Sequence, residues 1–207
     1  MKTISDYRTD ILVLLGDETG RRFSESILDM GLREALRQYG MYCPRLEQVT
    51  CRVSAVEGET AVVPWMFPPS VLPRWVRRKS TEDALRCGIE VREGKLLLSF
   101  YGGVMPAVDE VLFMEISVPH TIKGLDEGKA TTVPDGHGLI LCGGAAGYAM
   151  RIRARSVTEV FGKRPEDREA LSVQADMLIG DFVKALEKIS LIASFQQNPW
   201  PAANFRI

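Results

Sequence analysis

The chain has 207 residues, 45% of them hydrophobic and 26% charged, so it can bury a core without disulfides or a structural metal. Its 26 Lys and Arg residues are balanced by 27 Asp and Glu residues, and the net charge is -1. This balance excludes a protein that wraps nucleic acid through a large positive excess, because such binding depends on many cations displacing counterions.

The cysteines and the apolar segments predict a cytoplasmic protein without a cofactor. None of the four cysteines belongs to a C-x-x-C pair, so we expect reduced thiols and no zinc site. Residues 1–6 lack the apolar core of a signal peptide. The most apolar window, residues 138–150, is shorter than the roughly 20 residues that span a bilayer. We therefore expect no metal, no cofactor and no membrane partner.

The first 44 residues predict two short amphipathic helices. Apolar residues recur at helical spacing after Ser5, which is the expected N-cap, and the turn at residues 16–20 ends this helix. A second helix is expected to begin at Ser24 and to stop at Gly40. Neither helix is long enough to be stable alone, so both must pack on other parts of the chain.

The middle of the chain, residues 45–118, predicts a small antiparallel β module. Apolar and polar residues alternate from Val49 to Ala55, as in a half-buried strand, and Glu93 and Gly94 are a good hairpin turn pair. Prolines between residues 64 and 73 predict an irregular stretch. The expected strands are residues 49–55, 60–63, 88–92, 95–100 and 111–118.

Helical spacing returns after Pro134. Residues 139–160 predict one long helix, and residues 171–189 carry the clearest amphipathic stripe, whereas two prolines beyond Phe195 prevent further helix. The predicted fold class is α+β, with a helical bundle formed by the N- and C-terminal helices and an inserted antiparallel β module. The expected parts are a bundle from residues 1–44 and 119–195, a β module from residues 45–118, and an extended C-terminal arm from residues 196–207.

A run of small residues opens the predicted helix at residues 139–160. It contains Gly143, Gly144 and Gly147 and is followed by Tyr148. A dinucleotide site would need the order G-x-G-x-x-G and a following βαβ unit, but this sequence predicts helix after helix. We interpret the run as a surface for close helix packing, with Gly143 and Gly147 one turn apart, or as a subunit interface. An enzyme with a nucleotide at this run stays open as an alternative.

A basic cluster with an interleaved aromatic residue lies in the β module. It comprises Arg74, Trp75, Arg77, Arg78 and Lys79. Cations that follow a nucleic-acid backbone, together with aromatic rings that stack on bases, are typical of single-strand binding. Such runs also form solvated faces or interface rims. An interface, a DNA-channel lining and a nucleic-acid-binding module therefore stay open for this cluster.

No catalytic residue is predicted. Neither His120 nor His137 has a Ser or Cys partner at a spacing that indicates a nucleophile elbow, and both are expected to be ordinary polar loop residues. The paired carboxylates at residues 17–18, 109–110 and 166–167 lie at expected element ends. Acidic side chains in such places face water or favour helix N-termini.

The C-terminal arm combines prolines with large apolar residues. Prolines reduce the entropy lost when a segment docks, and aromatic side chains supply buried anchor area. We interpret the arm as a docking segment, and the alternative is that it folds back on its own domain. The residues expected to dock are Pro199, Trp200, Pro201, Phe205, Arg206 and Ile207.

Both ends of the chain carry a recurring pattern. The first helix ends in residues 14–17 (LLGD), the second begins at residues 23–25 (FSE), and Tyr39 and Pro44 close it. Residues 139–149 (LILCGGAAGYA) then lead into a charged helix. The final helix carries Ala175, Phe182 and Leu186. Over residues 4–44 and 134–192 this layout resembles the head-to-tail connector (adaptor) proteins of tailed bacteriophages, prophages and gene transfer agents.

The resemblance implies a structural virion protein of the neck, present in the host cytoplasm before assembly. Proteins of this family form a closed ring on the portal vertex, expected here to be a dodecamer, which extends the DNA channel and offers the tail an attachment surface. The implied partners are further copies of the chain, the portal protein, and tail or stopper proteins. Packaged DNA would pass through the ring without sequence-specific contact.

Two further expectations follow from the resemblance. Family members often lock onto the portal with a terminal segment, which makes residues 199–207 the expected portal-docking arm. The small members of the family are helical bundles, and this chain departs from them by its inserted β module. Another neck or head-completion role is therefore the alternative within the same class of protein.

Overall fold

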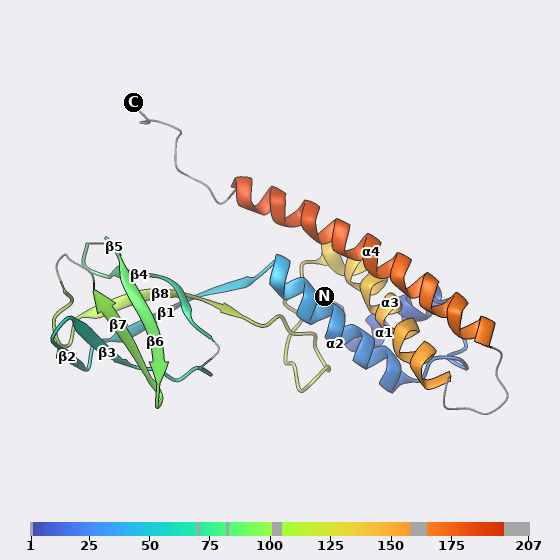
Figure 1. The fold of residues 1–207 in the computed structure, drawn as a ribbon, viewed down its shortest axis with the longest axis horizontal. Coiled ribbons are helices and arrows are strands. Elements are labelled where there is room, and N and C mark those ends of the chain that lie inside the picture. The colour runs from blue at the N-terminus through green and yellow to red at the C-terminus, as the bar shows by residue number, and fades with distance from the viewer. Residues whose placement is uncertain (1, 70, 82, 101–104, 158–164, 197–207) are drawn as a thin grey trace. The chain divides into compact units, whose positions relative to one another are not determined.

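The computed structural model describes residues 2–69, 71–81, 83–100, 105–157 and 165–196. Within these residues the chain is an α+β protein with four α-helices and two four-stranded antiparallel sheets (Figure 1). The predicted fold class is therefore confirmed. The chain divides into two compact units, one formed by its two ends and the other by residues 45–118.

The two ends of the chain form the helical unit. Its central helix, α3, packs against α1, α2 and α4, and Figure 1 shows α4 running alongside α3. The helical elements are α1 (Ile4–Leu14), α2 (Glu25–Tyr42), the short 3-10 helix η1 (Asp135–His137), α3 (Gly138–Val157) and α4 (Pro165–Gln196).

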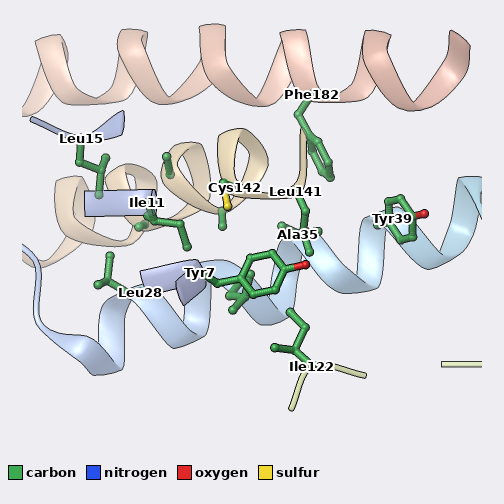
Figure 2. Packing of buried hydrophobic residues seen from close by; sticks show 14 of the residues in the cluster. Tyr7, Ile11, Leu15, Leu28, Ala35, Tyr39, Ile122, Leu141, Cys142 and Phe182 are labelled. Carbon is green, nitrogen blue, oxygen red and sulfur yellow. The ribbon is translucent and has the colours of Figure 1, made fainter. Parts of the chain in front are cut away.

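The apolar faces of these helices meet in a single core, part of which Figure 2 shows. Burying one large apolar side chain contributes about 1.5–3 kcal/mol, so this shared core accounts for the stability that two short helices lack alone. The labelled core residues in Figure 2 are Tyr7, Ile11, Leu15, Leu28, Ala35, Tyr39, Ile122, Leu141, Cys142 and Phe182.

The ends of α1 and α2 differ in part from expectation. Thr3, and not Ser5, is the N-cap of α1, because the Asp6 carboxylate accepts both the Thr3 backbone N–H at 2.6 Å and its hydroxyl at 2.8 Å. Ser24 occupies the N-cap position of α2 as predicted, but its side chain makes no capping hydrogen bond. The prediction that Gly40 ends α2 is wrong: the helix continues to Tyr42, close to Pro44, whose ring disfavours helical backbone at the residue before it.

Residues 45–118 form the β unit. The first sheet has the strand order β1-β8-β4-β5 and the second has the order β2-β3-β7-β6, and all pairs are antiparallel. A core that includes Trp65, Leu98 and Met114 draws on strands of both sheets. The strands are β1 (Arg45–Arg52), β2 (Ala55–Glu57), β3 (Thr60–Pro64), β4 (Pro73–Arg78), β5 (Ala84–Leu85), β6 (Cys87–Arg92), β7 (Lys95–Phe100) and β8 (Val111–Val118).

Two strands differ from the predicted pattern. The strand expected from Val49 to Ala55 is split, because the chain leaves the first sheet after β1 and enters the second as β2. The stretch expected to be irregular contains strand β4, in which Pro73 stands at the first position and a register shift separates it from Trp75. Proline is tolerated at these two kinds of place because no ladder hydrogen bond from its nitrogen is needed there.

Candidate functional site

The acidic turn between α1 and α2 is built around one buried carboxylate. Asp17 is 5% exposed and accepts the backbone N–H groups of Arg21, Arg22 and Phe23 at 3.2, 2.7 and 2.9 Å. Burial disfavours the charged form, but these three donors outweigh it and hold the pKa of Asp17 below its usual value. The carboxylate therefore fixes the path of the chain into α2. Of the two expectations for this acidic pair, Asp17 meets the one of a place near a helix N-terminus, whereas Glu18 is exposed.

The small residues of α3 allow α4 to approach closely. A Cβ at Gly144 would lie 2.6 Å from the Phe182 ring, and one at Gly147 would lie 2.8 Å from the Ile179 side chain. The helix-packing interpretation therefore applies to Gly144 and Gly147. It does not apply to Gly143, around whose Cβ position there is no atom within 4 Å.

The opposite side of α3 makes an equally close contact with α2. A Cβ at Gly31 would lie 2.6 Å from the Ala145 carbonyl oxygen and 2.9 Å from the Ala149 nitrogen. No sequence signal singles out Gly31, because an isolated glycine inside a helical pattern has many explanations. Tyr148, which follows the glycine run, is half-buried and has the Arg151 guanidinium 6.0 Å from its ring centre.

Tyr39 brings both histidines of the chain together. Its hydroxyl is 2.7 Å from Nδ1 of His137, and its ring centroid is 4.9 Å from that of His120. His120 is also hydrogen-bonded through Nε2 to the Cys43 carbonyl oxygen, at 2.8 Å, and through Nδ1 to the Thr132 hydroxyl. The two histidines were expected to be ordinary loop residues. Both do lie outside the α-helices and strands, and their hydrogen bonds also tie the C-terminal end of α2 to the segment before α3.

The thiols of Cys43, which is next to the Tyr–His cluster, and of Cys142 in the core are not set up as nucleophiles. Burial raises the pKa of the Cys43 thiol, and that of Cys142 to about 12, so both thiols are protonated at neutral pH. Among the residues that the structure describes, no group of three His, Cys, Asp or Glu side chains is placed to hold a metal ion. The hydrogen bonds of the cluster join the end of α2 to the segment before α3.

The basic cluster of β4 separates onto two faces of its strand. Arg78 is largely buried, with Nη1 3.4 Å from a carboxylate oxygen of Glu110. Arg77 is exposed and lies over the Trp75 ring, 4.4 Å from its centroid. Lys79 is exposed and lies 5.8 Å from the centre of the Phe113 ring. The cluster is therefore not one continuous basic patch, because Arg78 belongs to an internal ion pair.

The expected portal-docking arm, residues 199–207, lies outside the described residues. In the part of the chain that is described, no helix is long and apolar enough to cross a membrane. No family model and no curated protein matches the sequence.

Proposed function

We propose that this chain is a structural subunit of a head-to-tail connector, which forms a closed ring on the portal vertex of a tailed bacteriophage or a related particle. In this proposal the ring extends the DNA channel and gives the tail its attachment surface. Its partners are further copies of the chain, the portal protein, and tail or stopper proteins. Another neck or head-completion role is the alternative within the same class of protein.

One observation carries the proposal. The residues on which the resemblance depends lie far apart in the sequence, yet they belong to one core, to which Leu15, Phe23, Tyr39, Cys142 and Phe182 all contribute. Their positions are those of packing and turn residues, with Asp17 at the turn. A pattern that specifies packing suits a protein whose function is to hold a defined shape in an assembly.

The packing of α3 narrows the choice of subunit contacts in the proposed ring. Residues of α4 in the same chain contact α3 at Gly144 and Gly147, and α2 contacts it at Ala145 and Ala149. These residues therefore maintain the shape of one subunit. Side-to-side contacts that close a ring are heterologous, and under this proposal they use surfaces outside the α2–α3–α4 contacts.

The test is affinity capture of the tagged full-length chain from a lysate of its native source, followed by mass spectrometry. The proposal predicts recovery of portal, capsid or tail proteins at a high ratio to background. A matched tagged chain in which Trp200 and Phe205 are both changed to Ser should recover far less of them. Recovery of the chain alone, or with a metabolic enzyme, would contradict the proposal.

A further inference from the structure

The outer face of the first sheet of the β unit carries two aromatic side chains on neighbouring strands. Trp75 and Arg77 of β4 pair with Glu115 and Phe113 of β8, respectively. Residues that pair directly across two strands project from the same face, so these four side chains share one face. The intervening residue, Val76, is buried on the opposite face.

Each ring on this face has a cation beside it. The Arg77 guanidinium carbon lies 4.4 Å from the Trp75 ring centre and the Lys79 ammonium lies 5.8 Å from the Phe113 ring centre. Both cations are exposed and both rings are half-buried. Glu115, which pairs with Trp75, also projects from this face. We call the set Trp75, Arg77, Lys79 and Phe113 the aromatic–cationic face.

We propose that the aromatic–cationic face binds single-stranded nucleic acid. Unpaired bases stack on aromatic rings and on guanidinium planes, and the flanking ammonium and guanidinium groups neutralise phosphates. The two rings come from adjacent β-strands of one sheet. Successive bases of one nucleic-acid chain can therefore stack on them. Arg78 takes no part, because its side chain pairs with Glu110 on the other face.

The charge of the β unit favours a single strand over duplex DNA. Residues 45–118 contain nine Lys and Arg and ten Asp and Glu. Duplex binding that depends on releasing many counterions requires a positive surplus, which this unit lacks. Stacking on rings requires unpaired bases, and only a single strand offers them. This inference is independent of the connector proposal, because it concerns only the β unit.

The experiment measures binding of a fluorescein-labelled 15-nucleotide oligo-dT to the full-length chain by fluorescence anisotropy, at 50 and 200 mM salt. The variant Arg77→Ala with Lys79→Ala should bind at least about 5-fold more weakly, and its dependence of log affinity on log salt should be shallower by about 1.4. Trp75→Leu should also bind at least about 5-fold more weakly, since one stacked base contributes about 1–3 kcal/mol.

The matched control is Arg92→Ala with Lys95→Ala, which removes two exposed cations from the β6–β7 hairpin of the other sheet. It should bind as the unchanged chain does. If Trp75→Leu fails to fold by circular dichroism, the two double variants still decide the question.

Three outcomes would overturn the inference. The first is no binding of oligo-dT at 50 mM salt. The second is an equal loss of affinity in the two double variants, which would indicate a general charge effect. The third is binding of a labelled duplex or of a poly-glutamate peptide as tight as that of oligo-dT, which would indicate a simple anion surface.

Discussion

Asp17 is a buried charge whose hydrogen-bond donors all lie within six residues of it in the chain. Its carboxylate accepts N–H groups of the segment just before the second helix, and the left-handed backbone at Gly16 and Gly20, with φ of 57° and 64°, lets the chain turn around it. Charge-assisted bonds of this kind are stronger than neutral ones. The turn therefore depends on the ionised form of one side chain.

We predict that Asp17→Asn lowers the melting temperature at pH 7 and that the difference from the unchanged chain shrinks as the pH falls below about 3.9. The folded-state pKa of Asp17 is lowered, so its contribution to stability is present above the unfolded-state pKa of about 3.9. That contribution is lost as the pH falls through the folded-state pKa. Thermal melts from pH 7 to pH 3 measure the difference.

The control for this prediction is Glu18→Gln, which changes the next carboxylate along the chain. Glu18 is exposed, and its substitution should leave the melting temperature nearly unchanged at every pH. A difference between Asp17→Asn and the unchanged chain that stayed constant down to pH 3 would show that the charge of Asp17 does not stabilise the turn.

At the scale of elements, the close packing of α3 against its neighbours depends on glycines, which have no side chain. Gly144 and Gly147 face α4, and Gly31 of α2 faces α3. Glycine inside a helix costs about 0.5–1 kcal/mol relative to alanine. The close contacts with Phe182 and Ile179 offset that cost, because densely packed apolar groups gain dispersion energy that a wider helix separation would forfeit.

We predict opposite effects of the same substitution at two adjacent glycines. Gly144→Ala places a methyl group against the Phe182 ring and should destabilise the chain by about 1–3 kcal/mol. Gly143→Ala meets open space and should stabilise it by about 0.4–1 kcal/mol. Chemical denaturation of both variants measures the two values. Equal effects at the two positions would show that Gly144 does not set the α3–α4 distance.

A substitution at Phe182 tests whether its contact with Gly144 causes the predicted loss of stability. Phe182→Leu makes room at the Gly144 contact, so the double variant Gly144→Ala with Phe182→Leu should lose less stability than the two single losses added together. Additive losses would mean that the alanine methyl group and the ring do not meet, since residues in contact couple and distant ones do not.

Elements with a strong local signal were predicted well from the sequence. The hairpin at Glu93 and Gly94 has positive φ at both residues, 51° and 72°, as a tight hairpin turn requires, and β8 has the predicted bounds. Strand β4 was missed because the prolines around it indicate irregular backbone. The split between β1 and β2 was missed because the alternation of apolar residues continues while the pairing partner changes.

Contacts between distant residues could not be predicted. Tyr39, His120 and His137 lie in three segments that only the fold brings together. Which glycine of the run faces α4 depends on the rotation of α3, and a single sequence does not specify it to within one residue. Likewise, the pairing of Arg78 with Glu110, which divides the basic cluster, follows from strand register.

At the scale of the whole molecule, a β unit is inserted into a chain whose two ends build a helical unit. The strands that enter and leave the β unit are paired neighbours, with Arg45 opposite Val118. An insertion whose ends lie side by side requires no rearrangement of the segments that flank it. Under the connector proposal, the helical unit corresponds to the helical bundle of the small family members, and the β unit is an addition to that bundle.

We predict that deletion of residues 198–207 leaves the melting temperature nearly unchanged and abolishes assembly with the portal. The reason is that the proposed arm contributes its prolines and aromatic side chains to a partner and not to the core of its own chain. Differential scanning fluorimetry and co-purification with the portal measure the two effects. A loss of several degrees would instead place these residues in the chain's own core.

The most direct test of the connector proposal is negative-stain electron microscopy of the complexes captured through the tagged full-length chain. The proposal predicts closed rings, with copies of this chain seated on a portal and a central channel running through both. Class averages that show only single small particles, or this chain bound to an unrelated enzyme, would contradict it.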